Sequence, residues 1–362
     1  MRVEDVAVLS CPKCHGAVEL AGRYTEHSKA LVSGGLRCRR CRARYKVESG
    51  VPRFVASRAL DTKRKQTQAS YSAKWNRSPD YGTSSTKTRD FHNDWFVKRY
   101  GFRTEAALKK YLLEKQLILD AGTGLGRNTF WYSDLSHGRV FGLDISTAVD
   151  IARKKIRDNA RTTFVQGDIM SIPFATNTFD FVACDQVLPC VADPEAGLRE
   201  LVRVTKPGGH VAFYLYRRRG PIREFANDYL RDHISAMTFE RAWKECEPIT
   251  ELGKALSDLK ATIELKHPIP SLGIEAGKHD VQRLIFYNFL KCFWNDTHTF
   301  DENNLVNFDW YHPAFTYRHT EEEVQAWIRK LKLRVLHFDH DEPSGISVIC
   351  EKPRRPSRTK RS

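Results

Sequence analysis

One short segment, residues 117–126, constrains the fold of this chain most strongly. An apolar run over residues 117–119 ends at Asp120, and glycines follow at alternate positions: Gly122, Gly124 and Gly126. An apolar run that stops at glycines and continues into residues 127–132 predicts a strand, a tight loop and a helix. Because glycine lets the backbone approach a ligand closely, this loop is a candidate binding site.

Three later apolar runs also end at a carboxylate. Their terminal acids are Asp144, Asp168 and Asp185, and a fifth apolar run covers residues 210–216. Asp144 lies 24 residues after Asp120, where a doubly wound fold places a carboxylate against ribose hydroxyls. Because helical segments separate these runs, we predict an α/β fold with a doubly wound, mainly parallel sheet. Its ligand should lie at the carboxyl ends of the strands.

The spacing of the glycines argues against a dinucleotide ligand. The dinucleotide motif GxGxxG would need glycine at position 127, but that residue is Arg127, and the observed spacing is GxGxG. The sequence also lacks the phosphate loop that ends in Gly-Lys-Ser or Gly-Lys-Thr. A ligand without phosphate does not need such a loop.

The order of these motifs over residues 115–216 resembles the class I, seven-stranded S-adenosylmethionine-dependent methyltransferases. The resemblance implies that S-adenosyl-L-methionine is the cofactor and that residues 334–340 and 345–350 supply the sixth strand and the antiparallel seventh. It also implies which residues lie beside the methionine, ribose and adenine parts of the cofactor. The matching residues are Asp120, Gly122, Gly124, Gly126, Asp144, Ile145, Asp168, Ile169, Asp185 and Gln186.

The sequence departs from part of that family at the fourth motif. Many small-molecule members carry two histidines where Pro189 and Cys190 stand here, so no base or metal role is carried over to these positions. We interpret Cys190 as the packed start of a helix. The Asn/Asp-Pro-Pro-aromatic motif of amino-group methylation is absent. If a general base is used, our candidates are Asp185 and His319.

Four cysteines form two CxxC knuckles near the N-terminus. The pairs are Cys11 with Cys14 and Cys38 with Cys41, and 23 residues separate the pairs. Two such knuckles close a tetrahedral thiolate site, which suits structural Zn²⁺ and leaves no open position for catalysis. A redox CxxC and four unrelated thiols are the alternatives. The odd total of nine cysteines agrees with reduced thiols rather than with a disulfide framework.

Residues 7–56 resemble the small zinc-ribbon proteins that activate tRNA and translation-factor methyltransferases. The resemblance rests on the knuckles and on a closing aromatic, strand and Gly-x-Pro pattern at Tyr45, Val47 and residues 50–52. It implies that the ribbon packs on the catalytic domain in cis. The same ribbon family is also fused to enzymes with small-molecule substrates, so it does not determine the substrate.

More than a hundred residues separate the fifth strand from the expected sixth, and this insertion is rich in aromatic side chains. In such folds an insertion after the fifth strand lies over the substrate end of the sheet. Our candidate substrate residues are Trp95, Asp309, Trp310, Tyr311 and Arg217, with His319 and His92 as further pocket candidates. A second small core and a solvated basic turn are the alternatives.

These observations divide the chain into six parts. We expect a zinc ribbon (1–56), a linker (57–90), a cofactor-binding core (91–216), a substrate-cap insertion (217–333), the final core strands (334–351) and a basic disordered tail (352–362). Taken together, this is a seven-stranded α/β fold with a small ribbon and a helical, aromatic insertion.

The net charge of +15 is concentrated at the two ends of the chain. Residues 1–70 carry +9 and residues 352–362 carry +6, whereas residues 71–351 are neutral. The neutral core and aromatic insertion favour a small-molecule acceptor. The basic ends keep open an RNA or protein methyltransferase with a nucleic-acid or acidic partner, and a fold without catalysis is a third hypothesis. We expect no membrane span and no signal peptide, and therefore a cytoplasmic protein.

Overall fold

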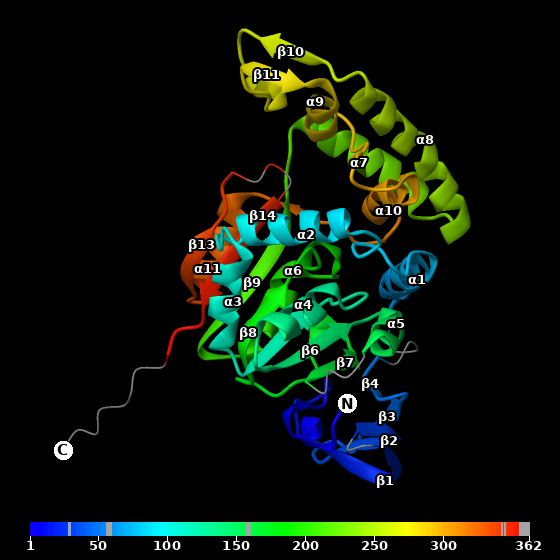
Figure 1. Ribbon diagram of the computed structural model, residues 1–362, viewed down its shortest axis with the longest axis vertical. Helices are drawn as coiled ribbons and strands as arrows, with labels where there is room; N and C mark the ends of the chain where they lie inside the picture. Colours follow the sequence, from blue (N-terminus) through cyan, green and yellow to red (C-terminus); the bar gives the residue numbers. More distant parts are fainter. Residues whose placement is uncertain (28–29, 56–59, 157–160, 342, 344, 355–362) are drawn as a thin grey trace, which may run out of the picture.

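The structure is a computed structural model that describes residues 1–27, 30–55, 60–156, 161–341, 343 and 345–354. A central sheet separates a small N-terminal unit from a helical cap (Figure 1). Its strands run in the order β7, β6, β5, β8, β9, β14 and β13, and β14 is antiparallel to β9. The strands are β5 (Leu117–Ala121), β6 (Arg139–Asp144), β7 (Thr162–Gln166), β8 (Phe179–Cys184), β9 (Thr205–Arg217), β13 (Arg334–Phe338) and β14 (Gly345–Glu351). This order confirms the predicted fold class.

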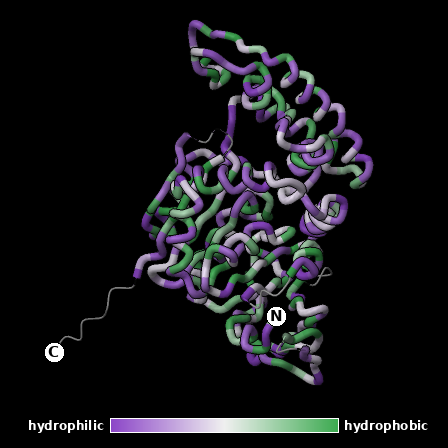
Figure 2. Tube along the Cα trace, in the orientation of Figure 1, coloured by the Kyte–Doolittle hydropathy of each residue, from purple (hydrophilic) through white to green (hydrophobic). Residues whose placement is uncertain are grey.

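Helices cover both faces of the sheet, which explains why its strands are almost continuous apolar runs. On one face Phe96, Leu108 and Trp131 pack on Ile118 and Phe181. On the other face the apolar sides of α6 and α11 join the main core. Hydrophobic residues accordingly gather along the central strands (Figure 2). The helices are α2 (Thr86–Arg99), α3 (Glu105–Leu113), α4 (Arg127–Leu135), α5 (Ala148–Lys155), α6 (Pro194–Val204) and α11 (Glu321–Lys330).

The N-terminal unit is joined to the catalytic sheet edge to edge. Its last strand pairs in parallel with β7 through Arg53 and Gln166, and the Phe54 amide donates to the Gln166 carbonyl at 2.8 Å. Leu9 forms a bridge with Phe174, and both residues belong to the main core. The N-terminal unit therefore packs on the domain of the central sheet within the same chain. Its elements are η1 (Val3–Val8), β1 (Val18–His27), β2 (Ala30–Cys38), β3 (Arg44–Glu48) and β4 (Val51–Arg53).

Two helices occupy most of the segment that we expected to be a linker over residues 57–90, so that expectation is wrong for its described part. Helix α1 (Thr62–Arg77) begins at the side-chain cap of Asp61, and α2 begins at the cap of Ser85. The buried positions of α1 are polar, because Thr67 and Lys74 line a cavity and the Ser70 hydroxyl contacts His312 at 2.8 Å. An amphipathic helix is normally predicted from an apolar face, and this segment has none, so its sequence resembles that of a linker. Residues 56–59 lie outside the described chain.

The cap packs around Trp243, Leu305 and Phe308 in an apolar cluster that also includes Tyr214 and Tyr216 of β9. It consists of α7 (Pro221–Ile234), α8 (Phe239–Asp258), β10 (Thr262–Leu265), η5 (Pro270–Leu272), β11 (Gly277–Asp280), α9 (Val281–Asn288) and α10 (Phe300–Tyr311). The expected boundary at residue 333 is too late. The short strand β12 (Arg318–His319) already pairs with β9, and α11 buries Val324 and Ile328 in the main core.

The C-terminal segment is partly fixed to the core. The Lys352 ammonium donates to the Asn177 side chain and the Val202 carbonyl, each at 2.7 Å, so this residue does not belong to a disordered tail. The rest of the expected tail, residues 355–362, lies outside the described chain. Among the described helices, none combines the length and the apolar character needed to cross a membrane.

Candidate cofactor and acceptor site

A cavity of about 540 Å³ lies between the carboxyl ends of the central strands and the cap. Its floor includes the glycine loop after β5 and the residues that follow β6, β7 and β8. Its walls and roof come from α1, α2 and the cap, which lie above the sheet in Figure 1. One continuous space therefore reaches from the predicted cofactor motifs to the insertion.

The glycine loop requires glycine on conformational and steric grounds. Gly122, Gly124 and Gly126 have φ values of +86°, +52° and +82°. A Cβ at Gly122 would lie 2.2 Å from Val187 Cγ2, and one at Gly126 would lie 2.8 Å from Phe164 Cζ. Gly122 and Gly124 line the cavity, whereas Gly126 lies behind it at the start of α4.

Asp120 supports this loop from below and does not line the cavity. It is 2% exposed, and its carboxylate accepts a hydrogen bond from the Thr129 hydroxyl at 2.7 Å. Burial raises the pKa of Asp120 to about 6. The residue that sequence reasoning placed beside the cofactor is therefore a positioning residue for the loop.

Asp144 lies at the end of β6 and faces the cavity. One carboxylate oxygen accepts the Gly124 amide at 2.8 Å, and the other accepts the Ser146 amide at 2.8 Å and the Ser146 hydroxyl at 2.7 Å. A carboxylate offers about four lone-pair directions, so capacity for a further donor remains. A ribose hydroxyl fits this position.

An apolar slot with a carboxylate at its edge adjoins Asp144. Ile145, Ile169, Met170 and Asp168 line it. The cavity lining therefore includes Ile145, Ile169 and Asp168, for which the sequence predicts cofactor contacts. Asp168 accepts the Met170 amide at 2.9 Å, and Arg64 of α1 lies 3.6 Å from its carboxylate. Burial raises the pKa of Asp168. A flat heterocycle with an exocyclic amine suits this slot.

Asp185 is held by two neighbouring side chains. The Arg99 guanidinium lies 2.5 Å from one carboxylate oxygen, and the Tyr100 hydroxyl donates to the other at 3.1 Å. Gln186 follows with a φ of +62°, and both residues line the cavity. Because one oxygen of Asp185 is engaged in a buried ion pair and the other accepts a hydrogen bond, this carboxylate is better suited to fixing the site's shape than to removing a proton.

The structure brings together four of the five predicted substrate residues and leaves out Tyr311. Trp95, Asp309, Trp310 and Arg217 line the cavity. Tyr311 lies two positions beyond Asp309, about 200° around the helix. Its hydroxyl donates to the Lys291 carbonyl at 2.9 Å within the cap core.

His319 also lies outside the cavity lining. Its Nδ1 is 3.3 Å from a carboxylate oxygen of Glu323, and its ring centroid is 4.7 Å from that of Trp327. The prediction placed it correctly just before a helix. The pairing of β12 with β9 nevertheless carries its ring onto α11 and away from the cavity.

Sequence reasoning missed the contribution of α1. Tyr71, Lys74 and Trp75 line the cavity, and the Lys74 ammonium lies 3.0 Å from the Asp309 carboxylate. A Cβ at Gly124 would lie 3.2 Å from the Trp75 ring, so this ring covers the glycine loop. The signal available in the sequence was the aromatic and basic residues at positions i, i+3 and i+4 of a polar helix.

His92 of α2 is a buried, neutral imidazole in the cavity wall. Its two ring nitrogens have no hydrogen-bond partner among the described residues, and Tyr81 and His298 approach its ring at 5.6 and 5.5 Å between centroids. Burial lowers the pKa of His92 to about 2. A neutral ring with an unused lone pair can accept a hydrogen bond from a ligand.

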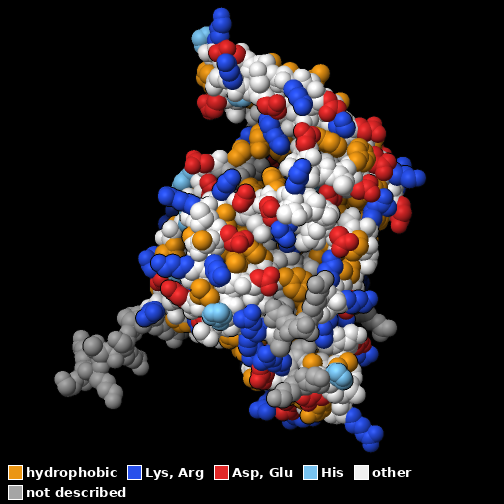
Figure 3. Space-filling view, viewed as in Figure 1, with side chains coloured by type: hydrophobic (Ala, Val, Ile, Leu, Met, Phe, Trp, Pro, Cys, Tyr) orange, Lys and Arg blue, Asp and Glu red, His pale blue; other side chains and the backbone are white. Residues whose placement is uncertain are grey.

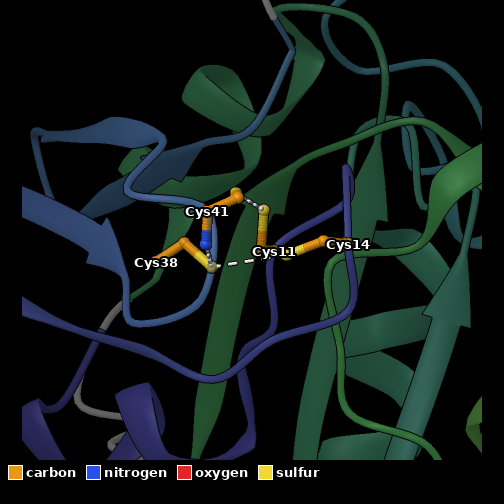
Figure 4. Close-up of side chains that lie close together, drawn as sticks. All are labelled: Cys11, Cys14, Cys38 and Cys41. Carbon is orange, nitrogen blue, oxygen red and sulfur yellow. Dashed lines mark hydrogen bonds between the residues drawn. The ribbon is translucent and has the colours of Figure 1, made fainter.

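The four N-terminal cysteines point toward one another (Figure 4). Their sulfurs lie within 4.8 Å of one another, and the pairs Cys11–Cys41 and Cys14–Cys38 are each 3.5 Å apart. Tetrahedral zinc–thiolate bonds of about 2.3 Å would place sulfurs about 3.8 Å apart. Tyr45 lies 3.0 Å from the Cys11 sulfur, where its hydroxyl can donate to a thiolate. The donor set therefore fits a zinc ion.

Comparisons with known proteins agree with this site. A sequence family described as a methyltransferase domain matches residues 119–213. Demethylmenaquinone methyltransferase of Renibacterium salmoninarum is 35% identical over 124 residues, which are 34% of this chain and 51% of the relative. The enzyme of that name from Lactococcus lactis is 31% identical over 174 residues, which are 45% of this chain and 68% of the relative.

One solved structure with a similar fold is magnesium protoporphyrin IX methyltransferase from Synechocystis PCC 6803 with bound S-adenosylmethionine. It is 12% identical, with a TM-score of 0.42, and the match covers 81% of this chain and 99% of that chain. The chain spans about half the length of the first curated relatives that it matches.

Fold and site together define a doubly wound α/β protein with a cavity at the carboxyl ends of its parallel strands. The glycine loop, the carboxylate after β6 and the slot after β7 belong to this class. The matched domain and the relative covered over two thirds of its length then identify the family. The chain belongs to the S-adenosylmethionine-dependent methyltransferases.

Proposed function

We propose that this protein transfers the methyl group of S-adenosyl-L-methionine to a small-molecule acceptor enclosed beneath the cap. The observation that carries this proposal is the single cavity that joins the glycine loop to Trp310 of the cap. Its volume of about 540 Å³ is in the range of sites that enclose small ligands. The relatives named demethylmenaquinone methyltransferases support a small acceptor.

Residues of the cavity floor would hold the cofactor. Asp144 would accept the ribose hydroxyls, and Asp168 would accept the exocyclic amine of adenine between Ile145 and Ile169. The backbone at Gly122 and Gly124 would lie along the methionine part, and the Arg127 guanidinium in the cavity wall would pair with its carboxylate. When bound, this cofactor supplies an electrophilic methyl group on a sulfonium.

The chain's own contribution to methyl transfer would be alignment of the acceptor with that methyl group. The Trp75, Trp95 and Trp310 side chains would confine the acceptor and exclude water. His92 would accept a hydrogen bond from the nucleophilic hydroxyl or amine and so orient its lone pair. We propose His92 for this contact in place of His319, which lies outside the cavity lining.

We also propose that Cys11, Cys14, Cys38 and Cys41 bind structural Zn²⁺. All four donors are used within the ribbon, so the ion would have no open position for a substrate. Because the ribbon shares the main core with the catalytic sheet, zinc would stabilise both units.

An RNA or protein acceptor is the alternative. Lys and Arg side chains gather over the ribbon end of the visible face, which favours binding of an anionic macromolecule there (Figure 3). Methyl transfer that falls by orders of magnitude between about 50 and 200 mM salt would support RNA. Transfer that is unchanged over this range supports the enclosed small acceptor.

Calorimetry with S-adenosylhomocysteine tests the cofactor assignment. The zinc-loaded protein should bind one equivalent, and binding should persist when residues 355–362 are deleted. No measurable heat at any concentration up to about a millimolar would overturn the assignment.

A further inference from the structure

Two cations meet on one aromatic ring in the cap wall of the cavity. The Lys291 ammonium lies 3.7 Å from the centroid of the Trp310 ring, and the Arg223 guanidinium carbon lies 5.6 Å from the same centroid. Asn227 fixes this arrangement, because its side-chain oxygen accepts from Trp310 Nε1 at 3.0 Å and from Arg223 Nε at 3.1 Å. Both cations line the cavity.

These two cations retain donors that the surrounding protein does not use. Arg223 is 4% exposed, and its Nη1 is buried without a hydrogen-bond partner among the described residues. Burial lowers the pKa of Arg223 to about 10, and burial together with the Arg223 charge lowers the pKa of Lys291 well below its usual value. Unsatisfied buried cations are costly, so an anion between them would be strongly favoured.

The acids and other cations around the cavity do not balance this pair. Asp309 already forms an ion pair with Lys74 at 3.0 Å. Arg219 donates to the Pro343 carbonyl at 2.9 Å and lies farther along the same wall. The Asp309 charge acts on Lys291 as well, but no carboxylate among the described residues forms an ion pair with Lys291 or Arg223. A ligand can therefore supply the direct counter-charge.

The cofactor's own carboxylate has a different cation available, because Arg127 lies beside the glycine loop on the cavity floor. We infer that Arg223 and Lys291 bind a carboxylate or phosphate group of the methyl acceptor, whose apolar body packs on Trp310 and Phe286. A guanidinium can hold either group through two parallel hydrogen bonds, and the ammonium adds a point charge. This inference rests on the proposed function, since it assigns the acceptor to the cap side of the cavity.

Ligand-observed NMR with benzoate, phenyl phosphate and neutral benzamide tests the inference on the full chain saturated with S-adenosylhomocysteine. Benzoate or phenyl phosphate should bind at least about tenfold more tightly than benzamide, and the stronger of the two identifies the anion. Lys291→Gln should remove most of this preference. Arg223→Gln should do the same, and Lys244→Gln, at an exposed position of α8, should leave it unchanged.

Three results would overturn the inference. The first is equal affinity for benzamide and the two anions. The second is an unchanged preference for the anions in Lys291→Gln. The third is weaker binding of S-adenosylhomocysteine to Lys291→Gln, which would show that Lys291 binds the carboxylate of the cofactor. Lys291→Gln keeps the test decisive if Arg223→Gln does not fold, since the Lys291 ammonium makes no hydrogen bond within the described chain. Failure of the wild type to bind S-adenosylhomocysteine would instead contradict the cofactor assignment.

Discussion

Lys74 of α1 and Asp309 of α10 form an ion pair of 3.0 Å that ties the segment before the catalytic sheet to the cap above it. The Lys74 side chain is 5% exposed and that of Asp309 is 25% exposed. Lys74→Met should therefore leave a partly buried carboxylate without its cation and lower the free energy of unfolding by about 3 kcal/mol. Chemical denaturation would measure this loss.

The exposed pair Lys254–Asp258 on α8 provides a matched control. Lys254→Met should lower the free energy of unfolding by less than about 0.5 kcal/mol, because this ion pair is exposed to solvent. Equal losses in the two variants would show that the Lys74 ion pair has no special role in joining the cap to the core.

Asp144→Asn should weaken binding of S-adenosylhomocysteine about tenfold or more, because the carboxylate that accepts from ribose would be lost. Asp134→Asn, at an exposed position of α4, should bind the same ligand as the wild type does. Calorimetry compares the two directly. An unchanged affinity in Asp144→Asn would remove this residue from the cofactor site.

Gly122→Ala should disrupt the cofactor loop, because its Cβ would meet Val187 at 2.2 Å and its φ is +86°. Gly22→Ala in the ribbon separates the two causes, since Gly22 has a φ of +78° and an added Cβ there would meet nothing within 4 Å. Both variants should lose about 1 kcal/mol of stability from backbone strain. Only Gly122→Ala should lose affinity for S-adenosylhomocysteine, and an equal loss in both would point to a global effect.

Asp120 should make stability depend on pH with a defined sign. Its pKa is raised to about 6 by burial, so the folded state binds its proton more tightly than the unfolded state. Stability from this group is therefore present below about pH 4 and lost as pH rises toward 6, by up to about 3 kcal/mol. In urea unfolding, the free energy of unfolding of Asp120→Asn should rise relative to that of the wild type as pH rises from 4 to 7. A difference that is constant with pH would contradict the raised pKa.

Cys38→Ser should release zinc and lower the melting temperature of the whole protein, because the ribbon and the catalytic sheet share one core. Cys350→Ser, a buried cysteine of β14, is the control for zinc content and should retain the metal. Elemental analysis distinguishes them. Full zinc occupancy in purified Cys38→Ser would refute the four-thiolate site.

Local patterns predicted the sheet and the residues at its strand ends that line the cavity. Each parallel strand is a buried apolar run, and the carboxylates at Asp144, Asp168 and Asp185 mark the points where those runs end. The two cysteines of each knuckle are likewise only three positions apart in the sequence. Such features are visible in the sequence because neighbouring residues determine them.

The acceptor side depended on contacts between distant segments. Helix α1 buries Thr67 and Lys74 against the cavity and Ser70 against His312, so it lacks the apolar stripe that predicts a helix. Lys291 and Arg223 come together only through the packing of the cap. His319 does precede a helix, as predicted, but the pairing of β12 with β9 directs its ring onto Trp327 of α11 and not into the cavity.

Methyl transfer to a small molecule beneath the cap can be followed with labelled cofactor. Cell extract incubated with the protein and methyl-labelled S-adenosyl-L-methionine would be separated into low-mass, RNA and protein fractions. Label should appear in the low-mass fraction for the wild type, and much less of it should appear there for Asp144→Asn. Label confined to RNA or protein, or equal labelling by Asp144→Asn, would contradict it.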